Sequence, residues 1–403
     1  MSLSPSVAAC LPPAELDRCL AVRDLTDPAA GPHALQLLVA AVVAALPGEH
    51  RVGRAPAVVS VLDNYENLGY PADAVTRDVR YTRYVSPTQV LRSHTSAMVP
   101  AALRALAAEG PAAPPDVLLA HPGMCYRRDS VDRLHTGTPH QLDLWRLRRA
   151  GPPGGSEPLG EDDLEAMIAA MVGAALPGAR WRAVPAEHPY TTHGRQLDVL
   201  AGPGGLVSGG SGSGSGEWVE IGECGLAAPG VLRGAGLPAG WTGLAMGLGL
   251  DRLLMLRKGI PDIRLLRATD PRVAGQLLDL APYRPVSRRP PVRRDLSLVV
   301  GPDTDATVEA LGDRVRAALG AAADTAEDVS VLADTPYAGL PPAARERLRL
   351  RPGQRNVLVR LTLRPLDGPL TDAGANALRD TVYLALHEGE AVELASPDPH
   401  APP

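Results

Sequence analysis

The 403-residue sequence contains no phenylalanine and only one lysine, Lys258. Ordinary usage would give on the order of ten phenylalanines in a chain of this length. A GC-rich codon bias accounts for the scarcity of lysine, yet nine tyrosines remain although their codons are equally rich in A and T. Codon bias alone therefore does not explain the missing phenylalanine. Because Lys258 is not followed by Ser or Thr, a Walker A phosphate-binding loop is excluded.

Paired cysteines, long apolar runs and a positive net charge are also missing. The cysteines predict reduced thiols rather than a disulfide framework or zinc site; they are Cys10, Cys19, Cys125 and Cys224. The longest apolar stretch, 34–46, is too short to cross a bilayer and predicts a core helix. Without a basic segment and apolar run at its start, the chain is expected to lack a signal peptide and to be cytoplasmic, with no membrane contact. The net charge of −5 restricts any RNA binding to local basic patches.

The most informative segment present is 241–264. Small and apolar residues alternate from Gly243 to Leu250, a pattern typical of a strand that packs closely on a ligand or another backbone. The pair Asp251-Arg252 then opens an apolar helix. Arg252 is therefore expected at a strand-to-helix junction, where a guanidinium can bind a phosphate beside a helix N-terminus. From these residues alone, an anion site and a buried strand with a surface arginine remain equally open.

The organisation of the chain predicts two domains, as its length also does. We expect a mostly helical segment over 1–55, helices near 97–108 and 161–175, and a strand over 217–224. A Gly/Ser-rich low-complexity loop occupies 205–216. Residues 281–292 read as a linker between a domain over 1–280 and a second over 293–396. In the second domain, a β-α-β-β-α-β order is expected over 295–300, 306–319, 329–333, 356–363, 372–386 and 391–394, which is the ferredoxin-like order.

The 241–264 segment resembles motif 3 of class II aminoacyl-tRNA synthetases, in the form found in phenylalanyl-tRNA synthetases. The matching residues are Gly243, Ala245, Gly247, Gly249, Asp251, Arg252 and Ile260-Pro261-Asp262-Ile263-Arg264. The C-terminal part, with 291–297 and 370–372, is similar to the anticodon-binding domain of single-chain organellar members. The resemblance implies an α+β fold, with a class II antiparallel sheet flanked by helices and a ferredoxin-like C-terminal domain. It also implies a monomer that uses ATP, Mg²⁺, tRNA and an aromatic amino acid.

A second segment resembles motif 2 of the same family. It runs from Tyr126-Arg127-Arg128-Asp129 through His135 to His140-Gln141-Leu142-Asp143. The resemblance implies that Arg127 binds the α-phosphate of ATP, Arg252 the γ-phosphate and His135 the phosphate tail. Fixed guanidiniums and Mg²⁺ stabilise the charge that develops on the phosphate oxygens during attack by a carboxylate. By the same resemblance, Asp129 and Glu220 belong to the ATP site, and Glu220 is the candidate Mg²⁺ ligand.

Further matches define the amino-acid site. The run 91–96 resembles the family segment L-R-(T/A)-H-T-S, 188–191 aligns with F-P-F-T, and 220–225 aligns with E-x-x-G-C-G. Gln141 and Asp143 match the pair that holds the substrate ammonium, and their spacing of two points both to one face of a strand. The resemblance implies these substrate-binding residues: His94, Ser96, Gln141, Asp143, His188, Tyr190, Glu223, Cys224 and Ala245.

This sequence departs from the family pattern at several of these positions. His188 and Tyr190 replace two phenylalanines that clasp the substrate ring, and Glu223 replaces a small residue. Pro139 stands where a phenylalanine stacks on adenine, Asp143 is shorter than the usual glutamate, and Gln196 replaces another glutamate. The polar changes either recognise a hydroxylated ring or only remain after phenylalanine was removed from the chain. A site built to hydrogen-bond a hydroxyl discriminates strongly against substrates that lack it.

These matches predict a phenylalanine–tRNA ligase-like enzyme, with tRNA contacts at Arg288, Arg289, Arg293 and Arg294. Two alternatives remain open: a relative specific for another, hydroxylated aromatic amino acid, and a non-catalytic tRNA-binding or regulatory protein. The absence of phenylalanine suggests the hypothesis that such a synthetase is translated when charged tRNA for phenylalanine runs out. If restored phenylalanine codons left its synthesis during phenylalanine starvation unchanged, the hypothesis would fail.

Overall fold

The structure, a computed structural model, describes residues 10–128, 130, 132–151, 156–202, 216–286, 290–366 and 368–392. The chain divides into two compact units. The first unit comprises residues 1–127, 138–266 and 274–284, and the second comprises 128–137, 267–273 and 285–403. Each unit has its own hydrophobic core.

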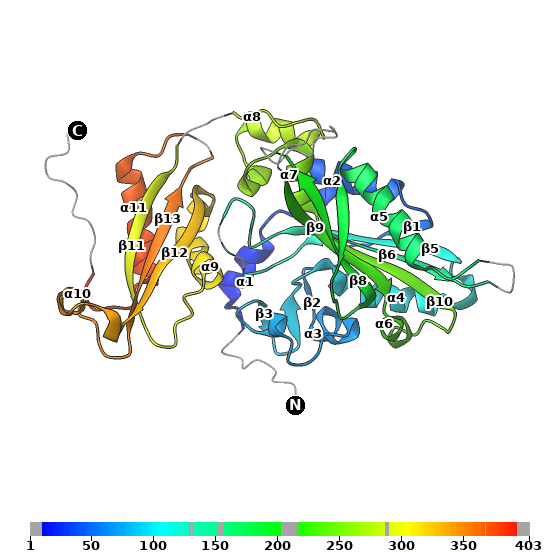
Figure 1. The fold of residues 1–403 in the computed structure, drawn as a ribbon, viewed down its shortest axis with the longest axis horizontal. Helices are drawn as coiled ribbons and strands as arrows, with labels where there is room; N and C mark the ends of the chain where they lie inside the picture. Colours follow the sequence, from blue (N-terminus) through cyan, green and yellow to red (C-terminus); the bar gives the residue numbers. More distant parts are fainter. Residues whose placement is uncertain are drawn as a thin grey trace. The chain divides into compact units, whose positions relative to one another are not determined.

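A seven-stranded sheet forms the centre of the first unit (Figure 1). Its strands follow the order β1-β5-β6-β10-β9-β8-β7. Only β1 and β5 pair in parallel; every other neighbouring pair is antiparallel. The expectation of a class II antiparallel sheet is therefore confirmed. The strands are β1 (Glu49–Val52), β5 (Asp116–Met124), β6 (His140–Arg149), β7 (Trp181–Pro185), β8 (Thr191–Ala201), β9 (Glu217–Ala227) and β10 (Trp241–Gly249).

Helices cover both faces of this sheet (Figure 1). The apolar residues of α2 (Ala34–Ala44), α5 (Glu161–Ala175) and α7 (Leu250–Lys258) pack with one sheet face in the largest core. Those of α4 (Val99–Ala108) and α6 (Pro229–Gly234) pack with the opposite face. The helices expected near 34–46, 97–108 and 161–175 thus form, and their apolar residues are the reason that they pack here.

The N-terminal part is less helical than its composition predicts. Helix α1 (Pro13–Leu20) and α2 form, but residues 49–52 extend as β1 because their backbone pairs with Val117–Ala120 of β5. Gly48 makes this change of direction at a φ of +104°, where a side chain would be strained. A three-stranded sheet follows, with the order β2-β4-β3 and a short helix beside it: β2 (Val58–Ser60), α3 (Val61–Asn64), β3 (Tyr84–Ser86) and β4 (Gln89–Leu91).

Lys258, the only lysine of the sequence, connects the end of α7 to a later segment of the first unit. The Lys258 side chain is 1% exposed, and its ammonium donates to the backbone and side-chain oxygens of Asp279 and to the carbonyl of Ala281. In return, the backbone N–H of Tyr283 donates to the carbonyl of Lys258. These contacts fasten the segment 279–283 to the last turn of α7. A buried ammonium requires such partners because it is costly to leave uncompensated.

The second unit contains a three-stranded antiparallel sheet with the order β11-β13-β12. Helices α9 and α11 pack on it through one apolar core. Along the chain the elements are β11 (Val292–Val300), α9 (Val308–Leu319), β12 (Ala326–Pro336), α10 (Pro342–Arg347), β13 (Arg355–Leu363) and α11 (Asp372–Leu386). The first five expected elements of the β-α-β-β-α-β order are present. The last strand was expected over 391–394; residues 391–392 are not in a strand, and 393–394 lie outside the described residues.

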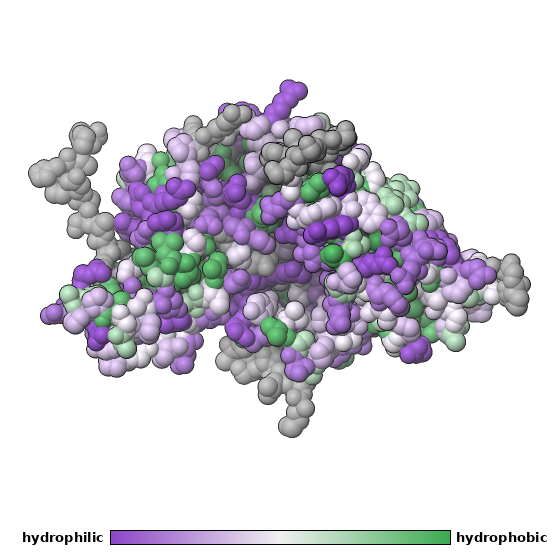
Figure 2. Space-filling view, viewed as in Figure 1, coloured by the Kyte–Doolittle hydropathy of each residue, from purple (hydrophilic) through white to green (hydrophobic). Residues whose placement is uncertain are grey.

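Hydrophilic side chains cover most of the face seen in Figure 2, and hydrophobic ones gather in small groups. No helix in the described ranges is long and apolar enough to cross a membrane. The stretch 34–46 instead supplies the buried side of α2, as expected for a core helix. The Gly/Ser-rich segment lies almost wholly outside the described residues.

Candidate active site

Four neighbouring strands of the large sheet place one row of residues across it. Asp143 of β6 lies opposite Gly247 of β10, which lies opposite Glu223 of β9. Glu223 in turn pairs with Gln196 of β8. Directly opposite residues project from the same face of a sheet. Two carboxylates therefore flank a strand position that has no side chain.

The bare surface over Gly247 is surrounded by polar atoms. A Cβ atom at Gly247 would lie 3.8 Å from Asp143 Oδ2, 3.8 Å from Tyr190 Oη and 3.9 Å from Glu223 Cγ. Ala245, two residues earlier on β10, packs in the same core as Trp145 and Tyr190. A small side chain at position 247 would therefore meet only side-chain atoms, at ordinary contact distances.

Asp143 is buried and accepts three hydrogen bonds. Its Oδ2 accepts from the hydroxyls of Thr95 and Ser96, each at 2.9 Å, and its Oδ1 accepts from Trp145 Nε1 at 3.2 Å. Burial raises the pKa of Asp143 to about 6, although these hydrogen bonds favour the ionised form. The result is a carboxylate that is ionised above that pH and gains from an added cation, such as a substrate ammonium.

Gln141 lies two residues before Asp143 on β6. Its Oε1 accepts from the backbone N–H of Thr95 at 3.2 Å and from Cys125 Sγ at 3.3 Å. Because Asp143 also accepts from Thr95 and Ser96, the segment that carries these two residues is held to β6 by both Gln141 and Asp143. The acceptor groups of the two β6 residues therefore lie together at this end of the row.

The other end of the row joins three polar side chains. Glu223 Oε1 accepts from Tyr190 Oη at 2.8 Å, and Glu223 Oε2 lies 2.5 Å from His188 Nε2. Burial alone would raise the pKa of Glu223, but the His188 and Tyr190 contacts hold that pKa below its ordinary value. Burial and the nearby Glu223 charge raise the pKa of Tyr190, which therefore stays protonated and donates. Glu223 is an ionised acceptor in this arrangement.

His94 lies among aromatic rings at the same site. Its ring stacks on that of Tyr70, with centroids 5.6 Å apart, and lies edge to face with Tyr65. Both ring nitrogens are buried, and neither has a hydrogen-bond partner in the part of the chain that the structure describes. Burial lowers the pKa of His94 to about 4, with the charge of Arg127 acting in the same direction. A neutral imidazole with an unpaired donor and acceptor is suited to a polar ligand group.

The two phosphate-binding candidates are each fixed by one hydrogen bond to a backbone carbonyl. Arg127 Nε donates to Ser93 at 2.8 Å, and Arg252 donates to Glu220 at 2.9 Å. Within the described residues neither guanidinium has a carboxylate partner, and each donates only to a backbone carbonyl. The Glu220 side chain is exposed beside Arg252. Positioned but unneutralised guanidiniums match what the binding of a polyphosphate requires.

Cys224 lies on the other face of the sheet from Glu223. Cys224 follows Glu223, so it projects from the opposite face of β9 into the core with α5, where burial raises its pKa to about 12. Cys224 is thus a core residue, which corrects its expected role in substrate binding. His135 belongs to the second unit, where its Nδ1 lies 2.7 Å from Asp132 Oδ2. Asp129, Arg288 and Arg289 lie outside the described residues.

The remaining tRNA candidates differ in their surroundings. Arg293 at the start of β11 is exposed. Arg294 donates to Asn376 Oδ1 and Asp372 Oδ1, each at 2.8 Å, and so holds the first turn of α11 on β11. Arg294 has a structural role that its sequence context did not reveal, and Arg293 is the more accessible cation.

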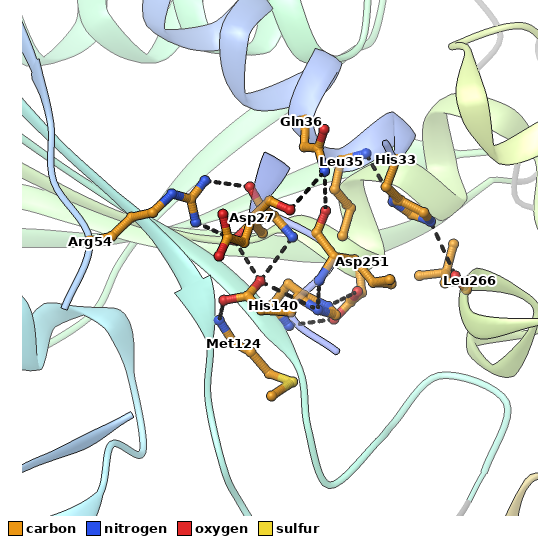
Figure 3. Close-up of polar contacts among 12 residues, drawn as sticks. Asp27, His33, Leu35, Gln36, Arg54, Met124, His140, Asp251 and Leu266 are labelled. Carbon is orange, nitrogen blue, oxygen red and sulfur yellow. Dashed lines mark hydrogen bonds and ion pairs between the residues drawn. The ribbon is translucent and has the colours of Figure 1, made fainter. Parts of the chain in front are cut away.

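A buried network connects the first residues of β6 and α7 with the N-terminal segment (Figure 3). Asp251 accepts from the backbone N–H of His140 at 2.6 Å and lies 2.8 Å from His140 Nδ1. His140 Nε2 accepts from the N–H of Leu25 at 3.1 Å, which places the ring proton on Nδ1. The network thus fixes the strand before Gln141 against the helix turn that carries Arg252.

Sequence reasoning missed several residues that build the site. His140 and Asp251 were read only as parts of motifs, and Thr95 and Tyr70 were not singled out. The pairs Thr95–Asp143, His140–Asp251 and Tyr70–His94 are each separated by more than twenty residues, so their contacts depend on the tertiary fold. The available signals were the positions of Thr95, His140 and Asp251 inside the motif-like segments; Tyr70 lies outside them.

Residues 43–277 match the family described as tRNA synthetases class II core domain (F). This match covers more than half of the chain and includes all seven strands of the large sheet. The chain therefore belongs to this class II synthetase family.

Among curated proteins, the chain is similar to the phenylalanine–tRNA ligase alpha subunit of Prochlorococcus marinus (strain MIT 9313), with 32% identity over 228 residues. That alignment covers 56% of this chain and 60% of the relative. The similarity to the alpha subunit of Mycobacterium avium (strain 104) is 36% over 214 residues, 52% of this chain and 56% of the relative. The chain thus spans about 60% of the length of the curated relatives it matches.

Proposed function

We propose that this protein is a phenylalanine–tRNA ligase-like enzyme, which activates an aromatic amino acid with ATP and transfers it to tRNA. The observation that carries the proposal is the row Asp143–Gly247–Glu223, together with Arg127 and Arg252, neither of which has a carboxylate partner among the described side chains. One end of the row suits an ammonium, and the aromatic side chains around Gly247 suit a ring. The names of the curated relatives support the same activity.

In the proposed reaction, Asp143 holds the substrate ammonium, helped by Gln141. An oxygen of the amino-acid carboxylate forms a bond to the α-phosphorus of ATP, and the bond to the β-phosphate oxygen breaks. Arg127 stabilises the charge at the α-phosphate and Arg252 that at the leaving pyrophosphate. No general base is required because the attacking carboxylate is already ionised. In the second step, a hydroxyl of the ribose at the 3′ end of tRNA forms an ester bond to the carbonyl carbon and loses its proton, while the bond from that carbon to the phosphate oxygen breaks and AMP leaves.

The residues present fit a Mg²⁺ ion that is shared with ATP. Among the described side chains there is no cluster of three His, Cys, Asp or Glu that would hold a metal ion without a substrate. Mg²⁺ usually binds through one or two carboxylates together with substrate phosphates. Glu220, exposed next to Arg252, is the proposed protein ligand, and the bound ion would neutralise phosphate charge. Asp129 is proposed for the same ATP site.

For the whole protein, we propose a monomer of the single-chain, organellar-like form that works in the cytoplasm. A catalytic domain over 1–280, a linker over 281–292 and an anticodon-binding domain over 293–396 are proposed for it. Arg293, with Arg288 and Arg289, would contact tRNA phosphates, and His135 the phosphate tail of ATP. Light scattering during size-exclusion chromatography measures the oligomeric state, and a dimer would contradict the monomer.

The test of the activity is amino-acid-dependent exchange of pyrophosphate into ATP. Exchange with phenylalanine or a related aromatic amino acid is expected, and R127A and R252A are expected to lose it. An exposed arginine outside the site, Arg80, provides the matched control R80A. RNA binding without exchange for any amino acid would instead support the non-catalytic alternative.

A further inference from the structure

We propose that the amino acid selected here carries a hydrogen-bond donor, such as a hydroxyl, on its aromatic ring, and that Glu223 recognises that donor. This inference rests on the proposed aminoacyl-tRNA ligase function. It concerns the end of the row opposite Asp143, where His188, Tyr190 and Glu223 meet. The chemistry and position of Glu223 carry the inference.

Glu223 has hydrogen-bonding capacity to spare. An ionised carboxylate has about four acceptor positions and no donor. Among the described residues, each Glu223 oxygen has one polar contact, from Tyr190 Oη or from His188 Nε2. These contacts keep the pKa of Glu223 below its ordinary value, so the group remains an acceptor at neutral pH. Its side chain is 39% exposed and therefore within reach of a ligand on the sheet.

The distance across the sheet matches such a substrate. Asp143 and Glu223 project from strands on either side of β10, about 9.5 Å apart at the backbone for two strand spacings. The bare Gly247 lies between them. An aromatic amino acid with its ammonium on Asp143 would place its ring over Gly247 and direct the far edge of the ring toward Glu223. Tyr70, His94 and Tyr190 supply aromatic surface along this path.

A plain phenylalanine side chain would gain little from this arrangement. Its ring would displace water from the Glu223 carboxylate and would give no hydrogen bond in return. A buried acceptor that loses its hydrogen bonds to water in this way reduces the affinity for the ligand. A ring hydroxyl would donate to Glu223 and restore the lost interaction. Sites built around a substrate hydroxyl discriminate against the analogue that lacks it. Glu223 would therefore favour hydroxylated rings over unsubstituted ones.

The test compares pyrophosphate exchange with phenylalanine, meta-tyrosine, para-tyrosine and the two corresponding fluorophenylalanines. The expected result is a kcat/KM at least tenfold higher for one tyrosine isomer than for phenylalanine and for the fluorinated ring of the same pattern. E223A should reduce this preference at least tenfold, and E223Q, which keeps one acceptor, should reduce it less. E187Q is the control, because Glu187 is an exposed carboxylate next to His188.

Exchange that is best with phenylalanine would overturn the inference and leave the ligase function standing. Silence with every amino acid would overturn the ligase function. In that case the recognition of the ring by Glu223 is tested by the shift of the thermal unfolding midpoint that each amino acid produces. A larger shift of the midpoint by a tyrosine isomer than by phenylalanine, lost in E223A, would support recognition, and equal or absent shifts would overturn it. Unfolding midpoints of E223A, E223Q and E187Q without ligand show whether each variant folds.

Discussion

Asp143 combines burial with three hydrogen bonds at one carboxylate. Thr95, Ser96 and Trp145 all donate to it, yet burial raises its pKa to about 6. The side chain is one methylene shorter than the glutamate expected at this position of the family pattern. The shorter reach is consistent with a carboxylate that stays close to its donors. Its protonation state then governs how well it attracts an ammonium.

Amino-acid binding is therefore expected to depend on pH near 6. Below that pH Asp143 is protonated and neutral, and above it the carboxylate is ionised, so kcat/KM for the amino acid should rise through pH 6 and level off. The pH profile of pyrophosphate exchange measures this. D143N should lower kcat/KM at least tenfold and remove this rise. A profile that is unchanged in D143N would assign the titration to another group.

At the residue scale, the sequence predicted which types of side chain meet, but not how they are paired. The spacing of Gln141 and Asp143 placed both on one strand face, and the structure agrees. The mutual contacts of His188, Tyr190 and Glu223 could not be derived, because they depend on the register between β8 and β9. Because side chains alternate along β9, this register also directs Cys224, the residue after Glu223, into the core on the opposite face of the sheet.

At the scale of elements, the glycines of β9 and β10 have different physical roles. A Cβ atom on Gly222 would lie 2.1 Å from the carbonyl oxygen of Gly247, which no backbone adjustment within the sheet accommodates easily. At Gly247 the nearest atoms are 3.8 Å away, an ordinary contact distance. Gly222 therefore permits close strand packing, whereas a Cβ atom at Gly247 would only touch the side chains of Asp143, Tyr190 and Glu223.

The pair G247A and G222A should separate function from stability. G247A is expected to change the free energy of unfolding by less than about 1 kcal/mol but to raise KM for the amino acid at least fivefold. G222A is expected to destabilise by about 2 kcal/mol or more, as overpacked sites do. Urea unfolding and pyrophosphate exchange measure the two effects. Equal stability losses in both variants would contradict this difference between the two glycines.

The network in Figure 3 links three elements through Asp251 and His140. D251A would leave two buried donors of His140 without an acceptor, which costs about 1–3 kcal/mol. We also expect a higher KM for ATP, because Arg252 is adjacent. E49A, which removes a largely exposed carboxylate paired with Arg51, is the control and should change stability by less than about 1 kcal/mol. Urea unfolding measures the stability of both variants. An unchanged KM for ATP in D251A would show that the network contributes to folding and not to ATP binding.

At the scale of the whole molecule, the proposed binding of tRNA depends on which arginines of the second unit are free of ion pairs with carboxylates and which are not. The proposed tRNA contact depends on exposed cations such as Arg293, whereas Arg294 is paired with Asp372. R293A is expected to weaken tRNA binding and to reduce the slope of log K against log salt by about 1. R294A should instead lower the stability of the second unit. Filter binding at several salt concentrations measures the slope, and an unchanged slope in R293A would exclude the contact.

Much of the large-scale architecture could be predicted because local pattern and resemblance agreed. The strand and helix of 241–258 and the β-α-β-β-α part of the C-terminal region follow from apolar periodicity. β1 was missed because four residues with three polar side chains, Glu49–Arg51, carry no alternating pattern. Its strand conformation comes from pairing with β5, a partner more than sixty residues away.

The burial of Lys258 has a consequence for chemical labelling. No other side chain of the sequence carries a primary amine, and this one is enclosed and hydrogen-bonded to Asp279 and Ala281. Acylating reagents that modify lysine will therefore find no accessible side-chain amine on the folded protein. The same reagents will reach Lys258 once the contacts of the 279–283 segment open. Acylation of this single position thus reports the opening of the first unit, without the background that a lysine-rich surface produces.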